Sequence, residues 1–253
     1  MNELLAQLID MSRRLGEPNR GLAILGEGNT SARVDPDTFY VKASGTMLRD
    51  IDETGFVRVS IRKVLPILDD EHAGDEEVTR VLSEALLDAG EKRRPSVETM
   101  LHAVLLQFPE YGFVGHAHPV YTNMILCSNR AEEAVAGRLF PDQIVSMGHR
   151  SVYVPYTDPG LCLAREVRRR LTRFVEDEGV LPRVILMQNH GVIAMGDSPR
   201  AVLSCLEMTE KASRVLVGTY AMGGPHFLSP EHVDRIFTRP DEKYRLQNIA
   251  GIR

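Results

Sequence analysis

The feature that most constrains the fold is the apolar stretch at residues 183–196, RVILMQNHGVIAMG, which only Gln-Asn-His-Gly interrupts. Each apolar half has the length of a strand, and the polar residues between them are typical of a tight turn. Further short strands are predicted at 30–34, 39–42 and 56–59, with turn residues between the first two. The chain is therefore expected to fold around a largely antiparallel sheet.

Helical patterns alternate with these strands. Residues 142–147 (DQIVSM) and 151–156 (SVYVPY) are predicted as two more strands. The predicted class is α/β with α+β-like layers: a single α/β/α domain over residues 1–224 with a largely antiparallel central sheet, followed by a tail at 225–253 that covers the active site or a subunit contact. Helices are predicted at 3–15 and 75–90, from the cap residue Ser96, before Gly179, at 199–221 and at 230–237.

The composition excludes several classes of protein. The net charge is −5 and the isoelectric point about 5.9, so no basic surface is available to bind nucleic acid. No stretch approaches the roughly 18 apolar residues that cross a bilayer. The three cysteines are far apart and form no CxxC motif, which is typical of a reducing compartment. We therefore expect a cytoplasmic protein with a small-molecule partner and neither a nucleic-acid nor a membrane partner.

Four residues form a candidate metal site. His116 and His118 are two positions apart on a predicted strand, so their side chains point to one face. His190 lies in the turn of the 183–196 hairpin, where Gly191 is expected to adopt a backbone conformation that other residues avoid. Glu98 is predicted in the first turn of a helix. Three imidazoles with an open position are typical of catalytic zinc sites.

The same residues are also compatible with a simpler interpretation. A His-x-His pair is commonly an ordinary pair of partly buried side chains. His102 follows Glu98 by four residues on the same helical face, so it could form a hydrogen bond with Glu98 instead. Spacing alone leaves both interpretations open.

Four motifs in order resemble the class II aldolase/adducin family. They are GEGNTSAR at 26–33, VKASGT at 41–46, PSVETMLH at 95–102 together with GHAHPVYTNM at 115–124, and QNHGVIAMG at 188–196. The resemblance covers roughly residues 3–220. It implies that His116, His118, His190 and Glu98 bind Zn²⁺, with Mn²⁺ or Co²⁺ as alternatives, and that Glu98 also acts as the catalytic acid/base.

The resemblance also implies a phosphate-binding site. The matching positions are Gly28, Asn29, Ser44, Gly45 and Ser96. Two departures bear on the substrate. Val97 stands where several sugar-phosphate aldolases of the family have a second serine, and the stretch LFPDQIVSMG lacks the tyrosine that protonates the leaving aldehyde in fuculose-phosphate aldolase. The identity of the proton donor therefore stays open.

The predicted function is that of a metal-dependent aldehyde-lyase. The hypothesis is cleavage or formation of a carbon–carbon bond next to a carbonyl through a zinc-stabilised enediolate, on a small sugar phosphate or a related ketose. Decarboxylation and epimerisation use the same intermediate and are alternatives. A non-catalytic adducin-like interaction module is a third, although such modules lack the metal ligands. The resemblance further implies a homotetramer with active sites between subunits.

Overall fold

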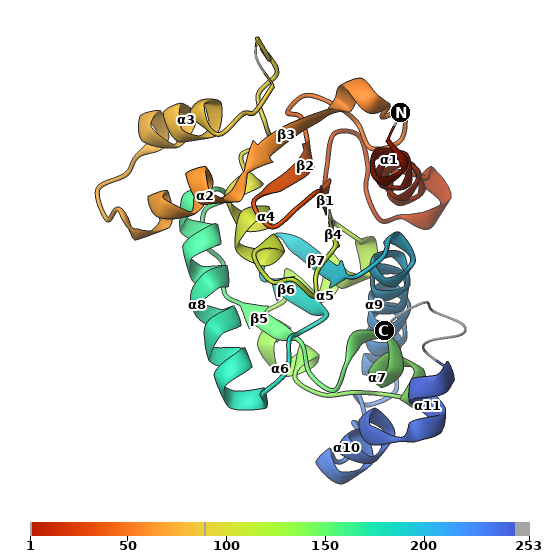
Figure 1. Cartoon of the computed structure of the whole chain (residues 1–253). Helices are drawn as coiled ribbons and strands as arrows, with labels where there is room; N and C mark the ends of the chain where they lie inside the picture. The colour runs from red at the N-terminus through yellow and green to blue at the C-terminus, as the bar shows by residue number, and fades with distance from the viewer. Residues whose placement is uncertain (1, 89, 246–253) are drawn as a thin grey trace.

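The computed structural model of the chain describes residues 2–88 and 90–245 and builds them around one mixed sheet (Figure 1). The strand order is β3-β2-β1-β4-β7-β6-β5, and neighbours are antiparallel except β5 and β6, which are parallel. The predicted, largely antiparallel sheet is confirmed. The strands are β1 (Asn29–Arg33), β2 (Thr38–Lys42), β3 (Phe56–Ser60), β4 (Phe113–Ala117), β5 (Val152–Val154), β6 (Val184–Met187) and β7 (Gly191–Gly196).

Helices cover both faces of the sheet. Figure 1 shows α4 (Thr99–Leu106) and α8 (Leu161–Glu178) on one side, and α1 (Glu3–Leu15) and α9 (Pro199–Tyr220) on the other. This is the expected α/β/α layering. The remaining α-helices of the described residues are α2 (Ile61–Val64), α3 (Asp75–Glu84), α5 (Val120–Leu126), α6 (Ala131–Val135), α7 (Pro141–Met147), α10 (Pro230–Thr238) and α11 (Pro240–Arg245).

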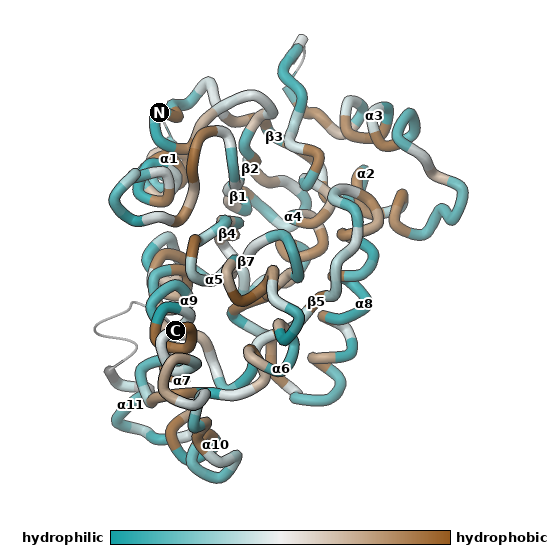
Figure 2. Tube along the Cα trace, turned by 180° about the vertical axis from the view of Figure 1, so that it is seen from behind, coloured by the Kyte–Doolittle hydropathy of each residue, from teal (hydrophilic) through white to brown (hydrophobic). Residues whose placement is uncertain are grey.

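Each face of the sheet has its own hydrophobic core. In β2, Phe39 and Val41 pack into the core beneath α4 and α8, whereas Tyr40 packs against the core beneath α1 and α9. This follows from the alternation of side chains along a strand. Figure 2 shows the hydrophobic positions running through the central strands. Because both faces are covered, β6 is apolar throughout, whereas β1 buries Asn29, Thr30 and Ser31 and is the most polar strand of the sheet.

The prediction of a strand at 142–147 is wrong, because these residues belong to α7. Pro141 occupies the first helical position, which proline favours, and Gly148 ends the helix with a φ of 82°. Ile144 and Met147, three residues apart, are buried on one side. The β-branched residues Ile144 and Val145 favoured a strand because Pro141, which favours a helix start, was not included in the pattern.

The start of α4 also differs from the prediction. Ser96 was expected to cap this helix, but the residue at the N-cap is Glu98, which therefore precedes the first turn instead of belonging to it. Ser96 still organises the approach, since its hydroxyl accepts a hydrogen bond from the Glu98 N–H at 3.3 Å and its carbonyl accepts one from the Thr99 N–H at 3.0 Å. Glu98 is thus held in a turn just outside the helix.

The described part of the tail packs beside α7. The ring of Phe237 in α10 lies 4.6 Å from that of His149, and Phe227 closes over Gly137. Residues 246–253 of the predicted tail lie outside the described residues. No helix within 2–88 and 90–245 is both long enough and apolar enough to cross a membrane.

Candidate metal centre

The two histidines of the His-x-His motif lie at the end of β4: both were predicted on the strand, but only His116 lies within it, and His118 comes directly after its last residue. His116 lies within β4, fully buried, with its Cα paired to Asn29 of β1 on one side and Ile193 of β7 on the other. His118 follows the strand and donates its N–H to the Leu22 carbonyl at 2.9 Å. The Nε2 atoms of the two imidazoles lie 2.9 Å apart. The strand geometry therefore brings both rings to one point.

The turn between β6 and β7 supplies His190. The residue in the left-handed conformation is Asn189, with a φ of 54°, so the expectation that Gly191 takes that role is wrong. Gly191 is needed for space instead, because a Cβ there would lie 2.5 Å from the Ala117 carbonyl oxygen and 2.6 Å from the His118 ring. The Asn123 side chain fixes the turn by donating to the His190 carbonyl at 3.1 Å.

Glu98 meets these three imidazoles. Its Oε1 lies 3.2 Å from His190 Nε2, and its Oε2 lies 3.5 Å from His116 Nε2. One nitrogen from each of the three histidines can be chosen so that all lie within 4.8 Å of one another. The structure thus brings together all four residues of the predicted metal site, from three segments that are far apart in the sequence.

Two hydrogen bonds orient the groups at this centre. His116 donates its Nδ1–H to the Val192 carbonyl at 3.0 Å, which leaves the Nε2 lone pair pointing toward the other imidazoles. Asn29 donates from Nδ2 to Glu98 Oε2 at 2.5 Å. The His102 ring bonds Asn29 and Ser31 and not the Glu98 carboxylate, contrary to the predicted alternative, although the His102 backbone N–H donates to the Glu98 carbonyl at 3.2 Å.

Burial sets the charge of the ligands. Desolvation lowers the pKa of both His116 and His118 to about 4, so both imidazoles are neutral at pH 7. Burial opposes the negative charge of Glu98, but the His116 and His190 rings and the Asn29 amide outweigh it and hold the Glu98 pKa below its ordinary value. His116 and His118 therefore present neutral nitrogens beside the Glu98 carboxylate.

This set of donors fits a divalent ion. Nitrogen ligands about 2.1 Å from a tetrahedral ion are separated by roughly 3.4 Å, which lies within the 4.8 Å that bounds the spacing of these nitrogens. Glu98 Oε1 is buried and accepts no hydrogen bond from any residue in 2–88 and 90–245. A buried carboxylate oxygen without a donor is costly unless a cation satisfies it. His116, His118, His190 and Glu98 are thus the residues that could hold the ion.

Beyond the end of β2 lie the residues that the resemblance assigned to phosphate. The Ser44 N–H donates to the Arg94 carbonyl at 2.8 Å, which joins the loop after β2 to the loop before α4. Gly45 has a φ of 82° and open space around the position of a Cβ. Ser96 Oγ lies 3.4 Å from Asn29 Nδ2. Gly28, with a φ of 69°, passes so close to the His116 carbonyl that a Cβ would lie 2.6 Å from its oxygen.

One residue beside the loop after β2 and the loop before α4 was not among the predicted site residues. Lys42 is the last residue of β2, is 5% exposed, and accepts a backbone hydrogen bond from the Ser96 N–H. Burial lowers the pKa of Lys42, while the charge of Glu98 opposes that shift. No carboxylate of the described residues lies within ion-pair distance of its ammonium group. The signal in the sequence was a lysine at the end of an apolar strand, directly before Ala-Ser-Gly, but its burial shows only in the structure.

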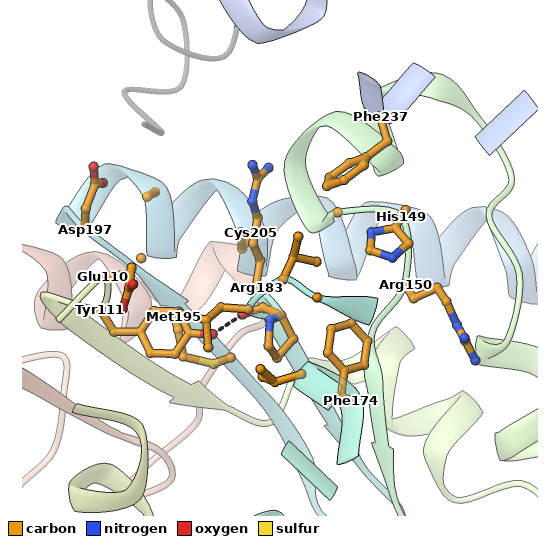
Figure 3. Close-up of a pocket in the computed structure, with 18 residues that line it drawn as sticks. Glu110, Tyr111, His149, Arg150, Phe174, Arg183, Met195, Asp197, Cys205 and Phe237 are labelled. Atoms are coloured by element: carbon orange, nitrogen blue, oxygen red, sulfur yellow. Dashed lines mark hydrogen bonds between the residues drawn. The ribbon is translucent and has the colours of Figure 1, made fainter. Parts of the chain in front are cut away.

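A separate cavity of about 480 Å³ lies at the other end of the β6–β7 hairpin (Figure 3). The rings of Tyr111, Phe174 and Phe237 line it, together with Arg183 and Cys205. Burial raises the pKa of the Cys205 thiol to about 11, so the thiol stays protonated. The cavity contains none of the predicted site residues, and the candidate chemistry belongs to the histidine centre.

A family model and curated relatives match this chain. The model described as Class II Aldolase and Adducin N-terminal domain matches residues 6–217. The oxidoreductase YuxG of Bacillus subtilis (strain 168) is 28% identical over 97% of this chain, which spans about a third of that relative's length (33%). Methylthioribulose-1-phosphate dehydratase of Microcystis aeruginosa is 28% identical over 76% of this chain and 85% of its own.

A solved structure shares the fold. The N-terminal class II aldolase domain of a conserved protein from Thermoplasma acidophilum superposes with a TM-score of 0.67 and 26% identity, over 86% of this chain and 95% of that one. The match to the family model extends over the strands and turns that carry the histidine centre.

Proposed function

The chain belongs to the class II aldolase and adducin family, and from that premise we propose that it is a metal-dependent lyase. The reaction is cleavage or formation of a carbon–carbon bond next to a carbonyl group. The observation that carries the proposal is the cluster of His116, His118 and His190 beside Glu98, whose buried Oε1 accepts no hydrogen bond from the described residues. We propose zinc as the ion, with manganese or cobalt as alternatives.

The bound ion supplies a Lewis acid beside the substrate carbonyl. In this proposal His116 and His118 hold their neutral Nε2 atoms toward the ion, and the turn at His190 closes the third side. Glu98 Oε1 receives or returns the proton on the carbon next to the carbonyl, and burial together with its neighbours sets the pKa of that carboxyl group. Hydrogen bonding by Asn29 keeps the other oxygen in place.

The substrate in this proposal is a small ketose that carries an anion, either a phosphate or a carboxylate. Ser44, Gly45 and Ser96 adjoin one another beyond β2 and offer hydroxyl and backbone donors. Val97 removes one hydroxyl from this group, but Lys42 brings a positive charge to the same loop pair. We propose that Lys42 attracts the substrate anion.

Two other reactions use the same centre. A decarboxylase or an epimerase would leave the same electron pair next to the carbonyl, and the Microcystis aeruginosa relative is a dehydratase of a sugar phosphate. A non-catalytic, adducin-like module is disfavoured because every ligand position is filled by a metal-binding side chain. We also propose the homotetramer of the family, with the tail at 225–253 covering the active site or a subunit contact.

The test is metal content followed by a substrate screen. The purified protein is expected to contain about one divalent ion per chain. Phosphorylated and non-phosphorylated ketoses would then be screened for retro-aldol cleavage, and β-keto acids for loss of carbon dioxide. If the reconstituted protein binds no divalent ion, the lyase proposal is wrong.

A further inference from the structure

A chain of buried hydrogen bonds leads away from Glu98 into the core. Asn29 Nδ2 donates to Glu98 Oε2 at 2.5 Å. The Asn29 side-chain oxygen pairs with His102 Nε2, and His102 Nδ1 lies 2.6 Å from Ser31 Oγ. Ser31 and His102 are fully buried, and Asn29 is 5% exposed. The chain connects one strand, β1, with the first turns of α4.

Charge fixes the direction of every bond in this chain. A carboxylate oxygen can only accept, so Asn29 must turn its amide nitrogen toward Glu98. Its oxygen then faces His102 and needs a donor, which requires the proton of the imidazole to sit on Nε2. The bare Nδ1 in turn accepts from the Ser31 hydroxyl. Burial lowers the His102 pKa to about 4, which keeps the ring neutral, as this arrangement requires.

We propose that Ser31, His102 and Asn29 form a positioning relay that binds Glu98 Oε2 and thereby presents Oε1 to the metal centre. The relay rests on the proposed function only for the role of Glu98 Oε1 at the metal centre. The order of hydrogen-bond donors and acceptors along the relay is a property of the metal-free protein. It also gives Asn29 a different role from the phosphate contact expected above, because the amide is engaged at both its oxygen and its nitrogen.

The geometry distinguishes this role from simple core packing. Glu98 offers two oxygens, and the relay engages only one of them. If the Asn29 amide were reversed, its oxygen would face a carboxylate oxygen at 2.5 Å, which is repulsive. Groups behind metal ligands typically fix ligand orientation in this way, and their removal costs about 10- to 100-fold in metal affinity.

The direct test is the tautomer of His102 in the metal-free protein. Long-range ¹H–¹⁵N correlation spectra of ¹⁵N-histidine-labelled protein at pH 7 are expected to show the proton on Nε2 and a bare Nδ1. Ser31→Ala, which removes the donor to Nδ1, is expected to weaken that preference. A wild-type spectrum with the proton on Nδ1 would overturn the relay whatever metal the protein binds.

The second test is Co²⁺ binding, followed by its visible absorption. Asn29→Leu removes the side-chain hydrogen bonds to Glu98, His102 and Ser96 at similar volume and is expected to lower Co²⁺ affinity by about 10- to 100-fold. Thr30→Val is the matched control, since Thr30 is equally buried on the same strand but bonds to Ser12 on the opposite face at 2.6 Å. It is expected to lose stability and keep the wild-type Co²⁺ affinity.

Each outcome of the Co²⁺-binding test either supports or contradicts the relay. Wild-type affinity in Asn29→Leu, or an equal loss in Thr30→Val, would reduce the relay to packing. His102→Gln retains a donor near the position of Nε2 and is expected to bind Co²⁺ more tightly than His102→Leu. If the wild-type protein binds no Co²⁺, the proposed function fails, and the tautomer measurement still decides whether the relay exists.

Discussion

Polar side chains are buried at both ends of the β6–β7 hairpin, but the two ends differ in whether these side chains have hydrogen-bond partners within the described residues. At the open end, Tyr111, Arg183 and Cys205 each donate to a backbone carbonyl of the chain. At the turn, His190 faces Glu98, whose Oε1 accepts no hydrogen bond from the described residues. Among the described residues, these three groups at the open end are therefore satisfied, whereas Glu98 Oε1 at the turn end lacks a donor, as expected of a site that binds a cation.

The difference shows which buried polar groups indicate function. Burying a polar atom without a partner costs roughly 1–3 kcal/mol, and more for a charged group. A folded chain keeps such an atom when a ligand satisfies it. The cavity in Figure 3 has a volume of about 480 Å³, but no buried side-chain polar atom of its described lining lacks a hydrogen-bond partner, so the histidine centre is the better candidate for chemistry.

The largest expected effect is loss of the metal at the turn end. His116→Ala and His190→Ala are expected to abolish binding of the ion, because each removes one of three nitrogen ligands. At a free-ion concentration of 100 Kd the wild-type protein gains about 2.7 kcal/mol of stability that neither variant gains. Elemental analysis and thermal unfolding with and without the ion measure both effects.

His149→Gln at the open end is the control for this experiment. His149 bonds Glu178 at 2.7 Å and contributes to the wall of the cavity. The His149→Gln variant is expected to retain about one ion per chain. Metal loss in this variant with the fold intact would contradict the contrast between the two ends.

The next effect is an acid sensitivity of the metal-free protein. Burial lowers the pKa of His102 and His116 from 6.5 to about 4. The unfolded chain therefore binds more protons than the folded one between these values, so stability is complete above pH 6.5 and is lost as the pH falls toward 4. Each fully buried imidazole contributes up to about 3 kcal/mol to this loss.

Urea unfolding of the chelated protein at pH 7, 5.5 and 4.5 measures that slope. His102→Gln cannot take up the proton and is expected to flatten it. Glu178 at the open end behaves differently: burial opposes its charge, but His149 and Arg150 outweigh burial and lower its pKa, so its contribution is lost only at lower pH. An unchanged slope in His102→Gln would show that His102 is not protonated on unfolding.

The third effect concerns the proposed binding of a substrate anion by Lys42, close to the turn end of the hairpin. Lys42→Met removes a buried ammonium group that has no carboxylate within ion-pair distance among the described residues. Replacing an unpaired buried charge by an apolar chain is expected to raise stability by about 1 kcal/mol. Affinity for phosphate or for a carboxylated ketose is expected to fall about tenfold or more, because a charge-assisted contact is lost.

Isothermal titration with inorganic phosphate and with an uncharged ketose separates these outcomes. Loss of both affinities would indicate a damaged fold, and loss of neither would contradict the role of Lys42. Lys63 is a matched control, since its ammonium group donates to the Glu84 carbonyl at the surface. Lys63→Met is expected to leave both affinities unchanged.

The sequence was sufficient to predict which four residues come together at the candidate centre and insufficient to predict the groups that orient them. Strand periodicity and the Asn-His-Gly turn predict the positions of His116, His118 and His190, because both depend on local backbone geometry. The relay could not be predicted, since the orientation of the Asn29 amide depends on a charge and on His102, which only tertiary structure brings together. Lys42 was missed for the same reason.

The secondary-structure elements likewise divide into those that the sequence predicts and those that it does not. The sheet and the long helices α8 and α9 follow from strong periodic patterns and were predicted within a few residues. The short helices α5, α6 and α7 were not, since five to seven residues carry too little periodicity to separate a helix from a strand or a loop. α5 matters most of these, because it begins directly after the His-x-His motif and supports the turn at His190.

The smallest expected effect tests that support. Glu210 in α9 accepts hydrogen bonds from the backbone N–H groups of Tyr121 and Thr122, both at 3.0 Å, and so caps the start of α5 with a negative charge. α5 in turn holds the turn through the bond from Asn123 to the His190 carbonyl. Glu210→Gln keeps the size but not the charge, and is expected to cost about 1 kcal/mol of stability, measured by urea unfolding.

The same variant sharpens the contrast between the two ends of the hairpin. Because Glu210 supports only the turn end, Co²⁺ affinity is expected to weaken slightly in Glu210→Gln, while hydrogen exchange at the open end stays as in the wild type. Glu207→Gln is the control, one turn away on α9, where an exposed ion pair with Arg20 contributes little. Equal losses in the two variants would show that a general surface charge effect, and not the cap on α5, explains the change.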